Sequence, residues 1–335
     1  MATIRDVAKL AGVSISTVSL AYSAPSRVSP DKLERIRAAA EVVGYHADPV
    51  AASLKRGRGK LIGLVMWDII NPFHNNMLRE LERIAMANDH FVIIVDSAGS
   101  PERERALIDQ LLGLRVAGIV LGPTGDGPAY AAHIRSIPVP VVCFDHRVEG
   151  TGRDFIGSDN RLAASMLTEH LLQLGHRRIA YIGGIEHLYT AMERRKGFIE
   201  TMQNAGVEID ETLMVDGAYN GEKSYAHTMR LMTRPDRPTA ILGANNDMAL
   251  AALMAIQELG FKCPEQISLA MIDDVPWSGV ITPRLTMVVQ NPVELGQLAA
   301  QRLLRRVLDP AAAAEPPQDL VLTPKFVAGA SSRGV

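Results

Sequence analysis

Residues 3–24 read TIRDVAKLAGVSISTVSLAYSA, and this stretch predicts two short helices joined by a glycine turn. Thr3 followed by Asp6 predicts a capping box at the start of the first helix. Gly12 ends that helix because glycine tolerates a positive φ, and Ser14 is a suitable N-cap for the second helix. Two short helices at this spacing are typical of a helix-turn-helix.

A third helix and a local excess of positive charge follow. Ser29 is a good N-cap, Pro30 suits the first helical position, and Gly44 can end the helix. Residues 1–60 carry ten Lys and Arg against five Asp and Glu, a surplus of five, whereas the whole chain has a net charge of −2. A basic head on a mildly acidic body indicates that the head contacts an anion such as DNA.

Residues 45–60 read YHADPVAASLKRGRGK. The segment after Pro49 predicts one or two helical turns, and so short a helix is marginal in water. The glycines and basic residues that follow are typical of a flexible linker. We therefore expect this segment to become ordered only against a partner.

Beyond residue 60, short apolar runs alternate with helical segments. Continuous runs rich in branched residues are typical of strands buried on both faces of a parallel sheet, and repeated β-α units predict doubly wound layers. The series divides into two similar halves of four strands, which face each other across a cleft. The expected strands are 61–66, 91–96, 118–122, 139–145, 178–184, 239–245, 268–273 and 285–290, and the helices include 75–88, 101–114, 162–174 and 193–206.

Composition excludes several classes of protein. The chain has 335 residues, 47% of them hydrophobic and 21% charged, as in a soluble globular protein. Its two cysteines, Cys143 and Cys263, provide neither a disulfide framework nor a zinc site. Apart from His146, we interpret most histidines as surface or capping residues, because their spacing is not that of metal ligands. We expect no cofactor, no metal and no catalytic residues, since no nucleotide-binding or nucleophile motif is present.

The order of motifs resembles the LacI/GalR family of bacterial transcription regulators. The motifs are T-I-x-D-V-A-x-x-A-G-V-S-x-x-T-V-S, then R-V-S-P, G-Y and V-A-x-S-L-K, and the resemblance extends from residue 3 to about residue 330. It implies an all-α helix-turn-helix head and an α/β periplasmic-binding-protein-like core of two doubly wound subdomains. The implied boundaries are 1–46 for the head, 47–60 for a hinge helix and linker, and 61–335 for the core. Subdomain one covers about 61–160 and 291–318, subdomain two about 161–290 and 319–330, and the crossovers lie near 159–162, 289–292 and 318–320.

The same resemblance implies a DNA-binding surface. The helix that starts at Ser14 enters the major groove, where Ile15, Ser16 and Leu20 occupy base-reading positions. Hydroxyl groups hold phosphates or support the helix. Leu54 wedges into the minor groove between paired hinge helices, with Lys55 beside it. Ile15 and Leu20 can contact thymine methyl groups but cannot bond to guanine, so direct readout is sparse. The complete predicted set is Ser14, Ile15, Ser16, Thr17, Leu20, Ser23, Tyr45, Leu54 and Lys55.

Polar and aromatic residues just after the strands predict an effector site, because ligands bind at the carboxyl ends of parallel strands. Carboxylates, amides and an arginine suit a polyol, whose C–H faces an aromatic ring can cover. The predicted set is Asn71, Phe73, Asp145, His146, Arg194, Tyr219, Asn246, Asp273 and Gln290. Purine-binding relatives have a basic residue near the position that Leu188 occupies here. A nucleobase is therefore a less favoured effector than a sugar.

We therefore expect a cytoplasmic, nucleoid-associated repressor that binds a two-fold symmetric DNA operator as a homodimer, with no membrane partner. A sugar or sugar derivative in the cleft changes operator affinity, and release is the commoner response to sugars in this family. One alternative is a purine or other metabolite as effector. The other classes are a solute-binding protein for transport, in which the basic head has no place, and an enzyme on a Rossmann-like sheet.

Overall fold

The computed structural model describes residues 2–23, 25–45 and 59–335, except for the side chain of Ser23. The chain forms two compact units, residues 1–60 and 61–335. Within the described residues, no helix is long and apolar enough to cross a membrane.

The first unit contains α1 (Ile4–Ala11), α2 (Ile15–Ser23), the short 3-10 helix η1 (Pro25–Arg27) and α3 (Pro30–Val43). Asp6 accepts hydrogen bonds from the Thr3 backbone N–H and hydroxyl at 2.9 and 2.7 Å. Gly12 has a φ of 63° after α1, as the turn requires. The predicted helix-turn-helix is thus confirmed. A small apolar core joins its helices, formed by Val7, Ala8, Ala11, Val18, Ala21, Val28, Ile36, Ala39 and Ala40.

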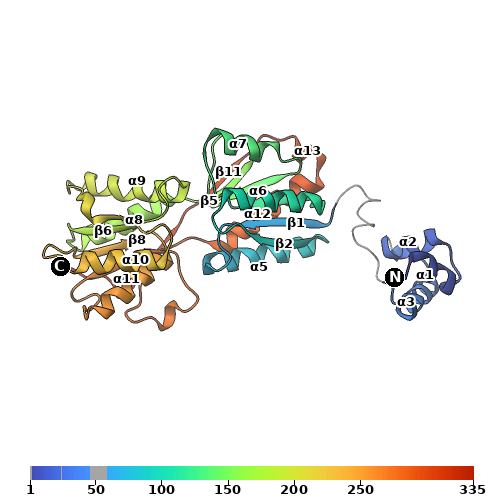
Figure 1. Ribbon diagram of the computed structural model, residues 1–335, viewed down its shortest axis with the longest axis horizontal. Helices are drawn as coiled ribbons and strands as arrows, with labels where there is room; N and C mark the ends of the chain where they lie inside the picture. Colours follow the sequence, from blue (N-terminus) through green and yellow to red (C-terminus); the bar gives the residue numbers. More distant parts are fainter. Residues whose placement is uncertain (1, 24, 46–58) are drawn as a thin grey trace. The chain divides into compact units, whose positions relative to one another are not determined.

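The second unit contains two six-stranded sheets, each with helices on both faces (Figure 1). The first sheet is parallel throughout, with the order β11-β5-β4-β3-β1-β2. Its strands are β1 (Leu61–Met66), β2 (Phe91–Asp96), β3 (Gly118–Leu121), β4 (Val141–Phe144), β5 (Asp154–Ser158) and β11 (Asp319–Leu322). The helices of this half are α5 (Pro72–Ala87), α6 (Pro101–Gly113), α7 (Gly127–Ser136), α12 (Pro292–Leu308) and α13 (Pro310–Ala313).

The second sheet has the order β12-β10-β9-β8-β6-β7, and only the β12–β10 pair in it is antiparallel. Its strands are β6 (Ile179–Gly183), β7 (Met214–Asp216), β8 (Ala240–Gly243), β9 (Ser268–Ile272), β10 (Thr286–Val289) and β12 (Lys325–Val327). Its helices are α8 (Asn160–Gln173), α9 (Tyr189–Asn204), α10 (Gly221–Met232) and α11 (Asn246–Glu258), with η2 (Glu211–Leu213) and η3 (Ser278–Val280).

The expectation of four strands per half was too low. The four additional strands are β5, β7, β11 and β12, and three of them lie at sheet edges. These three edge strands are only three or four residues long and partly exposed, so each lacks the continuous apolar run that reveals a buried strand. DLVL in β11 and KFV in β12 each contain a charged residue at an exposed position.

Three connections join the two halves. The chain passes from β5 to α8 near Asp159, from β10 to α12 at residues 290–291, and from β11 to β12 at residues 323–324. The third connection was expected at 318–320 and lies a few residues later, because β11 still pairs with β5 in the first sheet.

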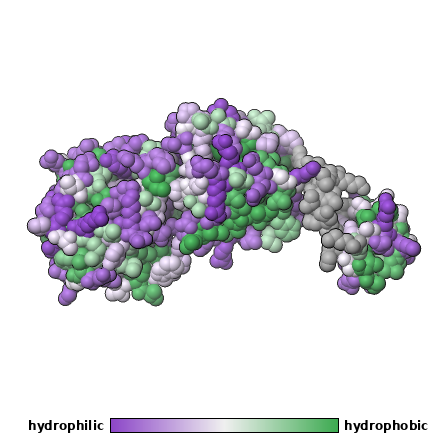
Figure 2. Space-filling view, in the orientation of Figure 1, coloured by the Kyte–Doolittle hydropathy of each residue, from purple (hydrophilic) through white to green (hydrophobic). Residues whose placement is uncertain are grey.

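Each half brings two helices into close contact at a glycine. A Cβ atom at Gly296 of α12 would lie 2.3 Å from the carbonyl oxygen of Met77 in α5, and one at Gly197 of α9 would lie 2.2 Å from that of Arg161 in α8. Only glycine permits these approaches. Figure 2 also shows apolar surface over α5 and β2, where Met86, Phe91 and Ile94 are exposed.

Candidate functional site

The head presents the start of α2 on its surface. The hydroxyl oxygen of Ser14 accepts a hydrogen bond from the Thr17 N–H at 3.1 Å and lies 2.8 Å from the Thr17 hydroxyl. Ser14 therefore caps α2, as predicted. Ile15 and Ser16 are exposed, so their side chains are free to meet a ligand of the head.

Two of the predicted DNA-binding residues also support the fold of the head. Leu20 is half-buried and packs against the small apolar core. Tyr45 is half-buried too, and its ring meets that of Tyr22 edge to face at 5.9 Å. Burial, and then the nearby Tyr45, raise the pKa of Tyr22. Leu54, Lys55 and the side chain of Ser23 lie outside the described part of the chain.

The turn between α1 and α2 is held by an arginine. The Arg35 guanidinium of α3 donates hydrogen bonds to the carbonyl oxygens of Ala11 and Gly12 at 2.7 and 3.4 Å. These carbonyls lie at the end of α1, where a helix leaves its acceptors unpaired. Arg35 thereby ties α3 to the end of α1 and to the turn that follows it.

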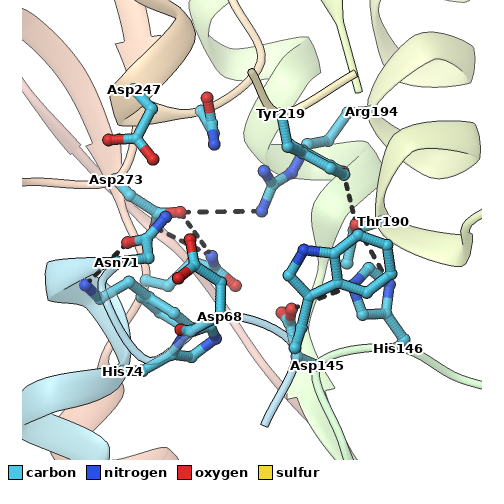
Figure 3. A pocket seen from close by; sticks show the side chains of 14 residues that line it. Asp68, Asn71, His74, Asp145, His146, Thr190, Arg194, Tyr219, Asp247 and Asp273 are labelled. Carbon is cyan, nitrogen blue, oxygen red and sulfur yellow. Dashed lines mark hydrogen bonds and ion pairs between the residues drawn. The ribbon is translucent and has the colours of Figure 1, made fainter. Parts of the chain in front are cut away.

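The core contains a pocket between its two subdomains (Figure 3). Eight of the nine predicted effector residues line it, and Asn246 does not. Six further residues complete the lining, namely Trp67, Asp68, His74, Thr190, Asn245 and Asp247. Trp67 and Asp68 directly follow β1, so the rule that ligands bind at the carboxyl ends of parallel strands also covers them. Thr190 lies in the first turn of α9, and no sequence pattern marked it as a binding residue.

The backbone at three strand ends takes an unusual conformation. Asp145 follows β4 with a φ of 62°, Asp273 follows β9 with a φ of 73°, and Tyr219 lies beyond β7 with a φ of 54°. Residues other than glycine rarely adopt positive φ, and such positions cluster at binding sites. The effect here is to turn all three side chains into the pocket (Figure 3).

Arg194 is fixed in the pocket by several acceptors. Its Nε donates to Asn160 Oδ1 at 2.7 Å, its Nη1 donates to the Ala244 carbonyl at 2.6 Å, and its Nη2 lies 3.8 Å from Asp273 Oδ2. The side chain is only 3% exposed. A buried cation held in this way is preorganised to meet a ligand beside Asp273.

Asp273 is paired with Gln290. The amide nitrogen of Gln290 donates to the two carboxylate oxygens of Asp273 at 2.8 and 3.1 Å. Burial raises the pKa of Asp273, although Arg194 and Gln290 oppose this rise. The amide oxygen of Gln290 is buried without a hydrogen-bond partner. Exchanging the amide atoms would place an oxygen against a carboxylate, so the observed orientation is the favourable one.

His146 and Thr190 form the opposite side of the pocket. The Thr190 hydroxyl lies 3.3 Å from His146 Nδ1 and 2.7 Å from the Tyr219 hydroxyl. His146 Nε2 lies 3.5 Å from Asp145 Oδ2, and its ring is 5.8 Å from that of Trp67. Burial lowers the pKa of His146, although the Asp145 charge opposes this. The histidine therefore stays neutral near pH 7.

The interpretation of the other histidines as surface or capping residues was wrong for several of them. His74 is 6% exposed, lines the pocket, and its Nδ1 lies 2.7 Å from the Asp68 carbonyl oxygen. His176 is buried in the second subdomain. A single histidine on an apolar face carries no sequence signal that separates these environments. Among the described residues, no group of His, Cys, Asp or Glu is arranged to hold a metal ion.

Comparisons with known proteins point to one family. Residues 3–48 match the model for bacterial regulatory proteins of the lacI family, and residues 168–332 match a periplasmic binding protein-like domain. The chain is 30% identical to the ribose operon repressor of Escherichia coli K12 over 92% of this chain and 94% of the relative. It is 28% identical to the HTH-type transcriptional repressor PurR of Haemophilus influenzae (strain PittEE), with both chains fully covered.

Solved structures give the same result. The lac repressor dimer bound to operator and an anti-inducer has a TM-score of 0.85 and 26% identity, with 99% of each chain covered. A complex of the transcriptional regulator CelR with cellobiose has a TM-score of 0.74 and 25% identity, covering 99% of this chain and 100% of the other. These similarities include both the head and the two-subdomain core.

Proposed function

The chain belongs to the lacI family of bacterial regulatory proteins, and from that premise we propose that it is a repressor controlled by a sugar or sugar derivative in its cleft. It is a DNA-binding transcriptional regulator with an effector-binding core. The head holds the operator through α2, and the core binds the effector. A family of this kind regulates transcription and has no catalytic step.

One observation carries the proposed effector class. The pocket offers the unpaired amide oxygen of Gln290 together with four carboxylates, Asp68, Asp145, Asp247 and Asp273, and a single arginine. Carboxylate and amide oxygens are thus well represented in the lining, and the buried Gln290 oxygen is costly unless a ligand donates a hydrogen bond to it. A polyol supplies a donor at each hydroxyl group, so it satisfies such a lining better than a planar base.

A purine is the alternative effector, and the relatives include the HTH-type transcriptional repressor PurR. The rings of Trp67, Phe73 and Tyr219 all line the pocket and offer stacking surfaces. Aromatic rings also cover the C–H faces of sugars, so these residues do not favour a base over a sugar. The four carboxylates and the unpaired Gln290 oxygen favour a ligand with several hydroxyl donors, and on this ground we propose a polyol.

We propose that the protein acts as a homodimer, because a two-fold operator requires two heads. The edge strand β2 and the adjoining helix α5 offer a surface for the second copy. Phe91 and Met86 are each 59% exposed there, and Ile94 is 37% exposed. Apolar side chains grouped at a sheet edge invite pairing with another chain.

The coupling between the sites follows from the three connections between subdomains. An effector that contacts both subdomains stabilises the closed cleft, and it shifts operator affinity only by its preference for that state. A typical coupling is about 1–3 kcal/mol. We propose that closure changes how the two hinge segments of the dimer meet the DNA and releases the operator.

Two linked experiments test this function. Duplexes enriched from a random pool by the purified chain supply an operator, and fluorescence anisotropy then measures binding with and without ligand. Thermal unfolding against sugars, sugar acids, sugar phosphates and nucleobases identifies the effector, because a ligand at about 100 times its Kd adds ~2.7 kcal/mol of stability. If a nucleobase is the only ligand that stabilises the protein, the proposed sugar effector is rejected in its favour. If no duplex is enriched, the proposed repressor function is rejected.

A further inference from the structure

Two carboxylates, one from each subdomain, line the effector pocket without a cationic partner. Asp68 lies just after β1 in the first subdomain, and Asp247 lies in the first turn of α11 in the second. Both side chains are half-buried and line the pocket, where Figure 3 shows them. Each wall of the cleft therefore contributes a negative charge to the same space.

A hydrogen-bonded pair holds these two walls together. Asn71, three residues after Asp68, exchanges hydrogen bonds at 3.3 Å with Asn246, the residue before Asp247. The two carboxylates are close enough to interact, since burial and then the nearby Asp68 raise the pKa of Asp247. Like charges repel, so closing the cleft around this pair costs free energy while both groups are ionised and no cation lies between them.

The other two carboxylates of the pocket have polar neighbours. Asp273 accepts hydrogen bonds from Gln290 and lies 3.8 Å from Arg194 Nη2. Asp145 lies 3.5 Å from His146 Nε2. Within the described lining, Arg194 is the single Lys or Arg, and its charge is already used beside Asp273.

Asp68 and Asp247 have no comparable neighbours. Asp68 accepts the Ile70 N–H at 2.8 Å, which is a neutral donor. In the part of the chain that the structure describes, no group donates to the Asp247 carboxylate. The N-terminus of α11 favours a carboxylate in its first turn, but it supplies only a partial positive charge. A ligand with a full positive charge would compensate this pair.

The chemistry of the lining favours a protonated amine over other cations. An ammonium group has three N–H donors and no acceptor, so it suits carboxylate and amide oxygens. The buried amide oxygen of Gln290 has no hydrogen-bond partner, which independently indicates that a donor from a ligand completes the lining. Among the described residues, no three His, Cys, Asp or Glu side chains are placed to hold a metal ion, so a divalent cation fits less well.

We propose that the effector is a polyol that carries a protonated amine, with its ammonium group between Asp68 and Asp247 and its hydroxyl groups along the rest of the lining. This inference rests on the proposed sugar-responsive function and adds the charge of the ligand. Because the two carboxylates belong to different subdomains, the ammonium group replaces a repulsion across the cleft by an attraction to both walls. The ligand then prefers the closed cleft, and such a preference is what coupling to the operator requires.

Calorimetric titration of the full-length chain with matched pairs of ligands tests the charge. Glucosamine is set against glucose, galactosamine against galactose, and glucamine against sorbitol, at a pH that keeps the amines protonated. Each pair differs by an amine in place of one hydroxyl group, and N-acetylglucosamine keeps the nitrogen without the charge. We expect at least one amine to bind at least tenfold more tightly than its neutral counterparts.

The other outcomes of these titrations separate this inference from the proposed function. Neutral sugars that bind as tightly as their amines overturn the inference and leave the sugar-responsive function standing. If magnesium or calcium chloride binds at the carboxylates and no amine does, the ammonium group is rejected in favour of a metal ion. If neither sugars nor amines bind, both the inference and the proposed sugar effector are rejected.

Substitution of the two carboxylates tests the location. Asp68→Asn keeps an oxygen for the Ile70 N–H, and Asp247→Asn keeps the shape of its side chain, so each variant removes one negative charge. We expect either variant to lower the ratio of amine affinity to hydroxyl affinity at least tenfold. Thermal unfolding without ligand shows that each variant is folded. A ratio that stays at the wild-type value in both variants overturns the inference.

Glu222→Gln is the matched control for Asp247→Asn. Glu222 occupies in α10 the position that Asp247 occupies in α11, the second helical residue after an asparagine N-cap. It is exposed and does not line the pocket. We expect Glu222→Gln to keep the wild-type ratio of affinities. An equal fall of the ratio in this control would assign the effect to the net charge of the chain and would also reject the inference.

Discussion

Asn71 and Asn246 exchange hydrogen bonds across the cleft, with each amide nitrogen 3.3 Å from the other residue's amide oxygen. Asn71 lies just before α5 in the first subdomain, and Asn246 is the first residue of α11 in the second. Asn71 also caps α5, because its oxygen accepts the Phe73 N–H at 3.0 Å. Asn246 was predicted to contact the effector, whereas its buried side chain links the two subdomains beside the pocket.

The cross-cleft pair predicts an effect on ligand affinity. Asn71→Asp keeps an oxygen for the Phe73 N–H but loses the amide donor to Asn246. A neutral hydrogen bond contributes about 0.5–1.5 kcal/mol, so we expect the cleft to open more readily and effector affinity to fall about 2- to 10-fold. Calorimetry measures the affinity, and thermal unfolding confirms that α5 keeps its cap. Unchanged affinity would show that the pair does not hold the binding-competent state.

Asp273 is predicted to be essential for effector binding and dispensable for DNA binding. Asn tolerates the positive φ of this position, so Asp273→Asn preserves the backbone while it removes the charge beside Arg194. Hydrogen bonds to charged groups contribute about 1.5–3 kcal/mol, which predicts a Kd raised about 10- to 150-fold. Operator affinity without effector should not change.

The neighbouring Asp274 supplies the control for this experiment. It is exposed and does not line the pocket, and its carboxylate accepts the Val275 N–H at 2.7 Å. Asp274→Asn should leave the effector Kd close to that of the wild type. If both variants bind the effector normally, the assignment of Asp273 is wrong.

Much of the pocket was predictable because one local rule places it. Asp145, Asp273 and Gln290 each follow a buried strand, and parallel strands gather their carboxyl ends at one edge. The same rule applies to Trp67 and Asp68 directly after β1, although neither was in the predicted set. Thr190 was out of reach, because its contact with Tyr219 depends on how α9 packs and not on any local pattern.

Asn246 shows a second limit of sequence reasoning. The run Asn245-Asn246-Asp247 follows β8, and its three polar side chains look equivalent along the chain. The start of α11 separates them, because Asn245 caps the helix through the Met248 N–H and successive residues of a helix point in different directions. Asn245 and Asp247 consequently line the pocket, while Asn246 bonds to a residue 175 positions away.

Ser14 has two expected roles, as the N-cap of α2 and as a DNA contact, and two substitutions separate them. Ser14→Ala removes the N-cap of α2, so it should lower the free energy of unfolding of the head by about 1 kcal/mol. Ser14→Asp retains an acceptor for the Thr17 N–H and adds a charge that suits a helix N-terminus, so the fold is preserved. A carboxylate facing a phosphate is repelled, so we expect operator binding by Ser14→Asp to fall more than tenfold in anisotropy titrations. Wild-type affinity in that variant would remove Ser14 from the DNA contact.

His176 predicts how the stability of the core depends on pH. Its Nδ1 lies 2.9 Å from the Thr239 hydroxyl and its Nε2 lies 3.0 Å from the Arg333 carbonyl oxygen. Burial lowers the pKa of His176 in the folded state below the ordinary value of about 6.5. As the pH falls below about 6.5, the unfolded chain takes up a proton that the folded chain refuses. This histidine thus removes up to about 1.4 kcal/mol of stability per pH unit, until the folded pKa is reached.

Urea unfolding between pH 7.5 and 5.5 measures this dependence. His176→Asn should be less stable than the wild type throughout, but its stability should fall less steeply as the pH is lowered. The exposed His187 provides the comparison, and His187→Asn should keep the wild-type slope. Parallel slopes for all three proteins would assign the pH dependence to other groups.

Leu54 carries the prediction for the hinge, and it rests on the sequence because this residue lies outside the described part of the chain. An apolar wedge that enters the minor groove unstacks a base step, and the bent DNA then contacts more protein. Leu54→Ala shortens the wedge, so we expect more than tenfold weaker operator binding at fixed salt and a smaller bend between fluorophores at the duplex ends. Effector affinity should remain unchanged. Leu10→Ala serves as control, because Leu10 is a 54% exposed leucine of the head. If Leu54→Ala binds and bends the operator as the wild type does, the hinge does not act as a wedge and specificity must come from α2 alone.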